Sequence, residues 1–539
     1  MHHNIKRLIL GAGIILLGTS TLLVWVNHQA KDTGVSGRPT YGQYTFNNSS
    51  PPRGGPSARA DGFVVGTQNS QVILPVMPPS RPMDIHTPET VIRNAAISSC
   101  FWPGPKSRPG FYTTDPDDYG IENQLPDTMN TFSTAWFRIP DGAKIILKGQ
   151  FPHERHWSFT TYSTNGVPRD SLDDIEINPD SGSSNPFRHG IQRDVKQRNY
   201  TIKISNGRPS RIPTANTVYT YSSANTAIGM HMRNYVPDRS QDYLGSVALP
   251  TMELHFDDGR VLTGNPACAA TTAPLRGKQV PLAVNPKVWQ ALNRLPWIDR
   301  SAGAAQYFDH APMEMFFNRQ YLILKTFFSP LALDNFAVQK GGFWSNLSTR
   351  YGYKFLSQSH GKVYAIRGKM PTTPKTWSGN NTPMDQDADM RYWSICSVMA
   401  PATGMTVDCL FDEAVAPLVD KKGNFTVVVS RAIDRPSNAI DKCGVAWLEW
   451  GNGDGIPGGS SNYGAIINRH TTVNPQFKYS WFAVNTPRTE QQAMGAYLPQ
   501  VINIHNKSKF ESLGCPVDVN KIDSFYESPQ MTHEQKPRT

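Results

Sequence analysis

The sequence predicts an all-β protein with minor helices: two tandem, duplicated antiparallel β-sandwich or jelly-roll domains joined by a partly helical linker. Three observations predict this fold. Apolar and polar residues alternate in short runs, turn signals separate these runs, and a set of landmarks occurs twice in the same order. The 42 Gly and 43 Pro residues among 539 favour turns over long helices, which excludes coiled coils and helical solenoids.

The N-terminus carries an export signal. Lys6 and Arg7 precede residues 8–26, which hold no charge and are rich in Leu, Ile and Val. This run is longer than the core of a cleavable signal and close to the length that spans a bilayer. We therefore expect residues 1–30 to form a membrane anchor rather than a cleaved signal peptide, with the rest of the chain extracytoplasmic, either periplasmic or at the cell surface. Cleavage, and hence secretion, remains the alternative.

The remaining boundaries follow from composition. Residues 31–75 are rich in Gly, Pro, Ser and Asn and lack a helical or strand period, as is typical of a flexible tether. We expect the first sandwich over 76–275, a connector over 276–345 with helices at 286–295 and 313–328, the second sandwich over 346–525, and a polar tail over 526–539.

The internal duplication is the most informative feature. The matching landmarks are residues 148–152 and 367–371, 155–158 and 391–394, 199–202 and 424–427, 248–250 and 497–499, and the closing cysteines Cys268 and Cys515. Residues shared by both copies are expected to be structural, namely Gly149/Gly368, Arg155/Arg391 and Trp157/Trp393. The second copy carries insertions of 17 residues before Trp393 and of 24 residues before Leu498, which predict surface loops.

Strands are predicted where the period is two. Tyr200, Ile202 and Ile204 alternate with polar residues, and the same pattern recurs at 252–256 and 425–429. The predicted turns lie at 141–142, 165–166, 206–207 and 258–259.

The cysteines and the charge narrow the class of protein. Six cysteines with no metal-binding spacing, behind an export signal, predict disulfides and no metal site. We expect Cys100 to pair with Cys268, and Cys396, Cys409, Cys443 and Cys515 to pair among themselves. The net charge is +10, but no dense Lys/Arg run occurs, so no nucleic-acid partner is expected.

One stretch resembles a known group of proteins. Residues 149–152, 156–160 and 180–187, within the span 130–187, resemble uncharacterised exported bacterial proteins related to β-sandwich domains of unknown function. The resemblance covers about a quarter of the chain. It implies an extracytoplasmic β-sandwich and brings no catalytic residues.

Residues present in only one copy are the functional candidates. His153, Glu154 and His156 precede a predicted strand, and Asp173, Asp174, Glu176 and Asp180 form an acidic run. Paired carboxylates can hydrolyse glycosides, so Glu154, Asp173, Asp174 and His156 are the catalytic candidates. The structural alternatives are a polar loop beside a strand for the first group and a solvated turn for the second.

The ligand-binding candidates follow directly along the chain. Asp180, Asn185, Arg188 and His189 lie in a polar, Gly-containing segment that could contact a sugar or phosphate. No cofactor is predicted. A calcium site is conceivable at 452–455, but Tyr463 stands where a calcium loop needs its closing Glu.

Two functions fit these observations. The first is an envelope protein that is anchored through residues 8–26 and binds a glycan, a lipid or a protein partner. The second is a carbohydrate-active or related hydrolase that uses the carboxylates and His of the first copy. The sequence does not decide whether the protein is an enzyme, because β-sandwiches host both activities.

Overall fold

The computed structural model describes residues 100–102, 125–164, 166–188, 190–239, 241–273, 311–317, 344–377, 387–399, 404–454 and 461–522. The predicted anchor, tether and tail, and the predicted helix at 286–295, lie outside these residues. We name residues 100–102 and 125–273 half one, and residues 311–522 half two. Within the described residues, no helix is both long and apolar enough to cross a bilayer.

Half one contains two sheets, and neither is closed. The first has the order β1-β7-β3-β4, with β1 (Asn130–Phe137), β7 (Ile228–Pro237), β3 (Glu154–Tyr162) and β4 (Pro168–Asp173). The second has the order β6-β5-β2-β8-β9, with β6 (Thr217–Tyr219), β5 (Asn199–Ser205), β2 (Ala143–Gln150), β8 (Thr251–Phe256) and β9 (Val261–Thr263). All pairs are antiparallel except β5 with β6.

In half two, four strands of each sheet follow the order seen in half one, and each sheet has one further edge strand. One sheet runs β11-β12-β18-β14-β15, with β11 (Glu314–Met315), β12 (Thr349–Ser357), β18 (Tyr463–Val473), β14 (Met390–Met399) and β15 (Met405–Phe411). The other runs β10-β19-β13-β16-β17, with β10 (Ala311–Pro312), β19 (Gln500–Asn503), β13 (Val363–Lys369), β16 (Asn424–Ser430) and β17 (Ala446–Glu449). Here too one pair is parallel, β16 with β17, which occupy the places of β5 and β6.

Helices are short and lie between strands. The α-helices are α3 (Gly264–Thr271), α7 (Asp412–Val415), α8 (Glu490–Met494) and α9 (Lys507–Glu511). The 3-10 turns are η2 (Asp174–Glu176), η4 (Ala416–Leu418), η5 (Ala432–Asp434), η6 (Asp441–Cys443), η7 (Trp481–Ala483) and η8 (Gly495–Tyr497). The described part of the chain is thus mostly β.

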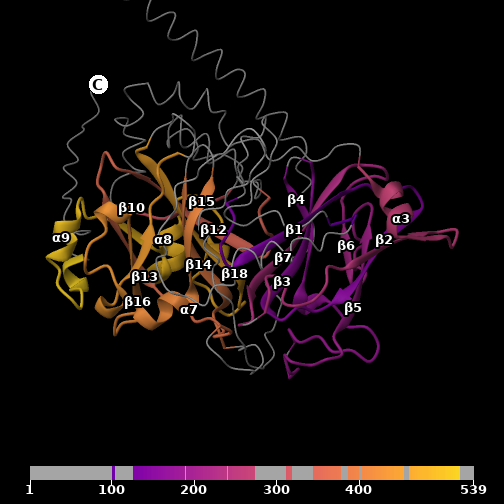
Figure 1. Ribbon diagram of the computed structural model, residues 1–539, viewed down its shortest axis with the longest axis horizontal. Coiled ribbons are helices and arrows are strands. Elements are labelled where there is room, and N and C mark those ends of the chain that lie inside the picture. Colours follow the sequence, from indigo (N-terminus) through magenta and orange to yellow (C-terminus); the bar gives the residue numbers. More distant parts are fainter. Residues whose placement is uncertain are drawn as a thin grey trace, which may run out of the picture.

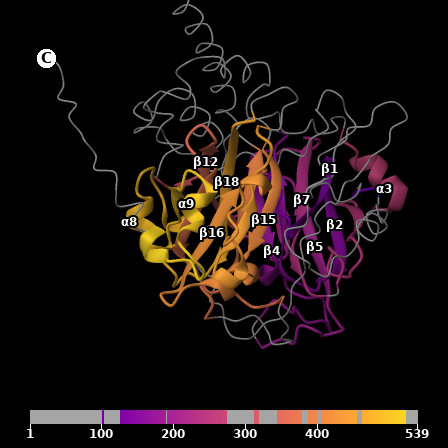
Figure 2. The same ribbon diagram turned by 60° about the vertical axis from the view of Figure 1, so that its left-hand side comes forward.

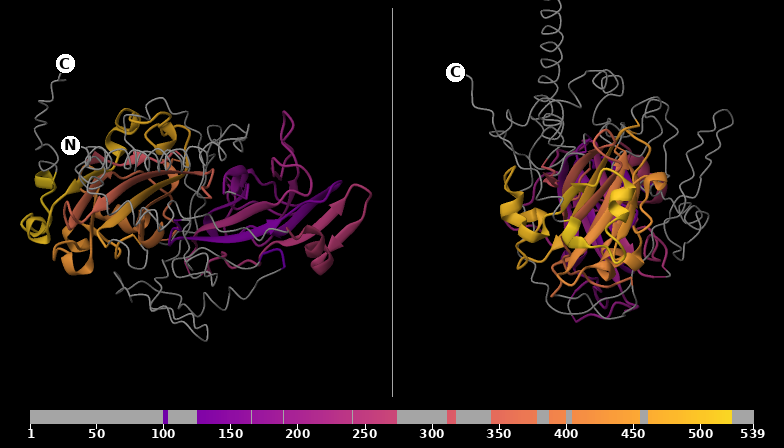
Figure 3. Two further views of the ribbon diagram at one scale, coloured as in Figure 1. Left: turned by 90° about the horizontal axis from the view of Figure 1, so that it is seen from above. Right: turned by 90° about the vertical axis from the view of Figure 1, so that its left-hand side faces the viewer.

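Each half has its own hydrophobic core, to which both of its sheets contribute. Phe159 and Met230 from one sheet of half one meet Ile145 and Leu254 from the other. Trp157 lies in this core and Trp393 lies in the corresponding core of half two, as expected for residues that both copies share. The halves lie side by side, with β3 and β7 of half one next to β14 and β18 of half two (Figures 1 and 3).

Several local predictions are confirmed. Strands occupy 199–205, 251–256 and 424–430, where the sequence alternates. At the predicted turns, Gly142 and Gly259 have φ of 64° and 89°, a conformation that costs glycine nothing. The helix predicted over 313–328 is wrong at its start, because Glu314 and Met315 pair with β12 as a strand. Figure 2 shows how closely the strand directions of the two halves agree.

The disulfides follow the predicted pattern. Cys100 bonds to Cys268, which are 168 residues apart, and closes half one. The other four pair within half two, as Cys396–Cys409 across β14 and β15 and Cys443–Cys515 between η6 and the segment after α9. No cysteine of the chain is free.

Candidate functional site

The strand β3 carries two of the predicted catalytic residues and is buried along its whole length. One face of β3 packs into the core of half one through Trp157 and Phe159. The opposite face carries His156 and meets half two, because the His156 ring contacts the Tyr235 ring on the neighbouring strand and Tyr235 contacts the Tyr392 ring at 5.6 Å. A strand in this position has no solvent-facing side, which explains why its polar residues are buried.

Two arginines cross the boundary between the halves. Arg155 of half one donates through Nη1 to both carboxylate oxygens of Asp412, each at 2.7 Å, and through Nη2 to Glu413 at 2.5 Å. Arg391 of half two donates to Asp174 Oδ1 at 2.5 Å. All of these groups except Glu413, which is slightly exposed, are at most 1% exposed. Buried ion pairs of this kind hold the two halves in one relative position, since separating them would leave bare charges inside the protein.

Each aspartate also fixes its own strand. The Trp157 backbone N–H donates to Asp174 Oδ2 at 2.8 Å, and the Trp393 backbone N–H donates to Asp412 Oδ2 at 3.0 Å. Burial raises the pKa of Asp412 to about 6, although Arg155 works against this shift. The pKa of Asp174 is lowered instead, because Arg391 and His156 together outweigh its burial.

His156 makes the Arg391–Asp174 ion pair different from the Arg155–Asp412 ion pair. Its Nδ1 lies 2.8 Å from Asp174 Oδ2, so Asp174 holds a histidine, a backbone amide and an arginine together. Tyr392 takes the matching place in half two, and its hydroxyl donates to Asp127 Oδ1 at 2.9 Å rather than to Asp412. The aspartate–histidine pair therefore belongs to half one alone.

Two further buried carboxyls adjoin this pair. Asp173 accepts a hydrogen bond from the Ser348 hydroxyl of half two at 2.6 Å, and burial raises the pKa of Asp173 to about 7. Glu154 accepts one from Asn234 Nδ2 at 3.0 Å, and burial raises the pKa of Glu154 well above its usual value. Both carboxyls thus hold a proton more tightly than a solvent-exposed carboxyl does.

Several buried atoms of this region have no hydrogen-bonding partner in the part of the chain that the structure describes. They are Glu154 Oε2, His156 Nε2, Ser158 Oγ and Asp173 Oδ2. Buried polar atoms almost always have a partner, so these are the positions at which water, a proton or a ligand group would be accommodated.

The structure thus brings together all four predicted catalytic residues, Glu154, His156, Asp173 and Asp174, at one junction. It also corrects both structural alternatives. Glu154 and His156 lie within β3 and not in a polar loop, and Asp173 and Asp174 are buried and not in a solvated turn. The reason in both cases is the neighbouring half, which covers the side of the sheet that would otherwise face water.

The predicted ligand-binding residues form hydrogen bonds that stabilise the loop in which they lie. Asn185 donates to the Asp174 and Ile177 carbonyls and is buried. Arg188 donates to the Ile175 carbonyl at 3.0 Å and to Asn178 Oδ1 at 2.9 Å, while Asp180 accepts from the Thr201 hydroxyl at 3.1 Å. These bonds give the three residues a structural use, and His189 lies outside the described residues.

Sequence reasoning missed the partners of these residues in half two. The ion pairs between the halves depend on Arg391 and Asp412 as much as on Arg155 and Asp174. Ser348 of half two also donates a hydrogen bond to Asp173. The presence of Arg at both 155 and 391 was the available signal, but the sequence does not reveal that each arginine binds the aspartate of the other copy.

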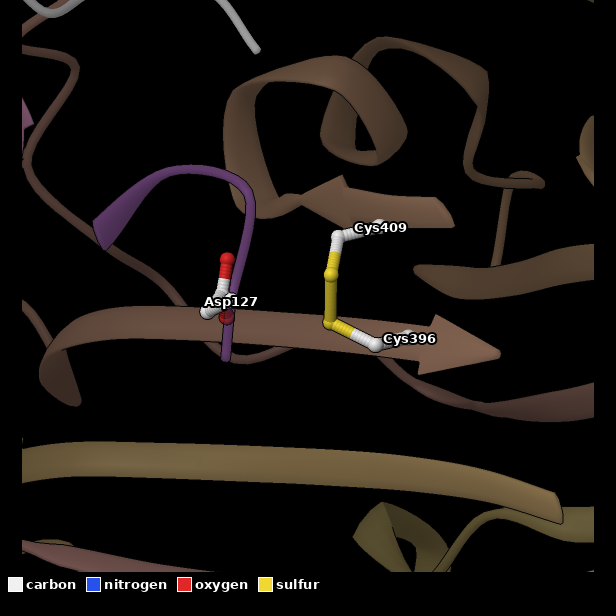
Figure 4. A group of neighbouring side chains, drawn as sticks. All are labelled: Asp127, Cys396 and Cys409. Carbon is white, nitrogen blue, oxygen red and sulfur yellow. A yellow bond between two sulfur atoms is a disulfide. The ribbon is translucent and has the colours of Figure 1, made fainter. Parts of the chain in front are cut away.

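A third group at the boundary involves Asp127, Cys396 and Cys409 (Figure 4). Donor atoms of these residues lie within 4.8 Å of one another, which resembles a metal site. Both sulfurs are, however, in the Cys396–Cys409 disulfide, and only a thiolate binds metal well. Arg469 Nη1, 2.8 Å from Cys396 Sγ and 3.3 Å from Asp127 Oδ2, adds positive charge where a cation would sit. The donor set therefore does not fit a metal ion, and Asp127 serves to link the halves.

The possible calcium segment at 452–455 gains no support. Asp454 is buried, and Gly455 lies outside the described residues.

Comparison with known proteins leaves the family open. No family model matches the chain, and no curated protein matches it. Among solved structures, it is similar to an uncharacterised protein from Burkholderia cenocepacia, with 12% identity, a TM-score of 0.37, and coverage of 77% of this chain and 87% of the other. It is also similar to the VPA0106 protein of Vibrio parahaemolyticus, with 10% identity, a TM-score of 0.33, and coverage of 70% and 90%.

Proposed function

We propose that the protein is an extracytoplasmic envelope protein that is anchored through residues 8–26 and binds a glycan, a lipid or a protein partner. The observation that carries this proposal is that all six cysteines are paired in disulfides. Such complete pairing is typical of proteins that fold in an oxidising compartment, whereas reducing cytosol keeps cysteines as thiols. The apolar run behind Lys6 and Arg7 supplies the matching export signal.

We further propose that the body consists of two β-sandwiches that arose by duplication. Three features support this. Four strands of each sheet follow one order in both halves, each half has its single parallel pair at the same place among the described strands, and each half presents an arginine and an aspartate to the other. The crossed pairs make one rigid body, which suits a protein that presents a fixed surface to a ligand.

The test is to express the full chain in a bacterial host, separate envelope from cytoplasm, and label thiols in denaturant. We expect the chain in the envelope fraction, with no thiol labelled before reduction and six labelled afterwards. The matched control is the double variant Ile15→Arg/Leu16→Arg, because each charge within the apolar run costs about 3 kcal/mol of insertion free energy. That variant should stay in the cytoplasm with reactive thiols. Recovery of the parent chain from the cytoplasm with six reactive thiols would overturn the proposal.

A second candidate function, a carbohydrate-active or related hydrolase, is favoured by one observation. Two carboxyls whose pKa values are raised by burial, Glu154 and Asp173, adjoin the His156–Asp174 pair, and carboxyls with raised pKa values are typical of acid–base sites. If the parent chain releases nitrophenol from a panel of nitrophenyl glycosides, Glu154→Gln should abolish turnover while Asp141→Asn, at an exposed turn, leaves it unchanged. Equal turnover of the two variants would exclude this assignment of residues.

A further inference from the structure

An aromatic cluster lies at the surface of half two, with Phe477 and Tyr479 from the segment after β18 and Tyr497 from the segment just before β19. Phe477, Tyr479 and Tyr497 contact one another, with ring centroids 4.9 Å apart for Phe477 and Tyr497 and 5.8 Å apart for Tyr479 and Tyr497. The two tyrosine rings are nearly parallel, at 12°. Phe477 packs against the core of half two, whereas the Tyr479 side chain is 52% exposed. The core thus uses Phe477 and leaves the tyrosines available to solvent.

One lysine contacts this cluster, and three more lie nearby along the chain or its paired strand. Lys369 Nζ lies 5.4 Å from the Tyr497 ring centroid, and the exposed Lys478 separates Phe477 from Tyr479 along the chain. Lys369 is the last residue of β13 and is paired with Asn424, the first residue of β16. The exposed Lys421 and Lys422 lie in the turn that comes directly before β16.

The nearby acids are engaged elsewhere. Asp389 accepts from the Thr372 backbone N–H at 2.8 Å, and Asp420 binds Arg367 and the backbone of its own turn. Among the described residues, neither Lys369 nor Lys478, Lys421 or Lys422 forms an ion pair with a carboxylate. Asp389 keeps its negative charge and acts on Tyr497, so the positive charge at this end of half two comes from lysines that outnumber this one acid.

The fold does not require these residues. At the corresponding positions half one has Gln150 in place of Lys369 and Ala248 in place of Tyr497, and Gln150 donates to Asn199. A half with the same strand order is thus complete without the cluster, so its exposed rings need a reason other than stability.

We propose that Tyr479, Tyr497 and Lys369 form a binding site for an acidic polysaccharide. A tyrosine ring offers an apolar face on which the C–H face of a sugar ring can stack and a hydroxyl that can bind its oxygens. The lysines supply charge for the carboxylates of such a polymer. Nucleic acid is disfavoured, because this chain has no dense basic run. The inference rests on the proposed envelope function and names the ligand class for it.

The experiment measures binding of the full oxidised chain to polygalacturonate, with fully methyl-esterified polygalacturonate as the neutral probe of equal ring structure. We expect binding to the charged polymer and at least about tenfold weaker binding to the ester. Tyr479→Ala and Tyr497→Ala should each weaken binding about tenfold, as expected for the loss of one stacked ring. Lys369→Gln should weaken binding and reduce its dependence on salt, which screens charge pairs.

Two controls make the result decisive. Tyr479→Phe keeps the ring and should bind almost normally, and Lys196→Gln removes an exposed lysine of half one and should change nothing. Unchanged binding by Tyr479→Ala and Tyr497→Ala, or equal binding of both polymers, would overturn the site. An envelope-located chain that binds neither polymer would also overturn the site while leaving the proposed function standing, whereas a cytosolic chain would defeat the proposed function itself.

Discussion

The two arginine–aspartate crossings at the junction occupy matching positions in the two halves but have different surroundings. Asp412 depends on Arg155 for its positive partner, and Glu413 adds a second carboxylate to the same arginine. Asp174 has Arg391 and, in addition, His156. A fold can therefore repeat a structural ion pair while one copy alone adds a titratable group, and that asymmetry separates structural residues from candidate functional ones.

The largest effect is expected from Arg155→Ala. This change removes the guanidinium that binds the buried Asp412 and the neighbouring Glu413, which should lower the free energy of unfolding by about 3–5 kcal/mol. Arg391→Ala should cost less, since His156 and the Trp157 amide still bind Asp174. Urea unfolding measures both, and Arg188→Ala, in a half-buried surface loop, is the control with a loss of about 1 kcal/mol or less. Equal losses for Arg155→Ala and Arg391→Ala would mean that His156 does not support Asp174.

The next prediction concerns Asp173→Asn, which should change the free energy of unfolding by an amount that depends on pH. The pKa of Asp173 is about 7 in the folded chain against 3.8 for an ordinary aspartate. As pH rises from about 4 to 7, the unfolded chain releases a proton that the folded chain retains, so this group lowers stability progressively. Asparagine cannot ionise, so the variant should gain at most about 4 kcal/mol relative to the parent at pH 7 and nothing below pH 4.

The neighbouring Asp174 should behave in the opposite way. Its pKa is lowered in the folded chain, so its contribution to stability is present above its unfolded pKa and is lost as pH falls through the folded one. Asp174→Asn should therefore be destabilising at pH 7 and approach the parent on acidification. Unfolding curves for both variants that run parallel to the parent across pH would contradict the environments assigned to these two carboxyls.

The smallest expected effect is a difference in stability loss between alanine substitutions at the matching glycines Gly149 and Gly368. A Cβ at Gly149 would lie 2.5 Å from the Tyr200 hydroxyl oxygen, whereas a Cβ at Gly368 would lie 3.2 Å from the nearest Phe425 atom. Gly149→Ala should cost about 1–2 kcal/mol through overpacking, and Gly368→Ala about half as much. Adding Tyr200→Phe to Gly149→Ala should recover part of the loss, because it removes the nearest atom. Thermal unfolding measures these differences, and a larger loss for Gly368→Ala would reverse the comparison.

Much of the fold could be predicted from the sequence because one-sided burial leaves a period of two. The strands that begin with Asn199 and Thr251 face their core on one side only, so apolar and polar residues alternate. The strand β3 was harder to interpret. Its residues Ser158 and Thr160 are polar, as on a solvated face, yet they are buried because half two covers them.

The sequence by itself determined the β class, the turns and the residue types shared by the two halves, because these depend on local periodicity. The Cys100–Cys268 bond is the preferred pairing among several, and the structure decided it. Only the tertiary structure decided where each charge finds its partner. Asp174 lies 217 residues from Arg391, and Arg155 lies 257 residues from Asp412. Spacing along the chain carries no information at that range, since the contacts exist only when the polar faces of two complete sheets meet and exclude water.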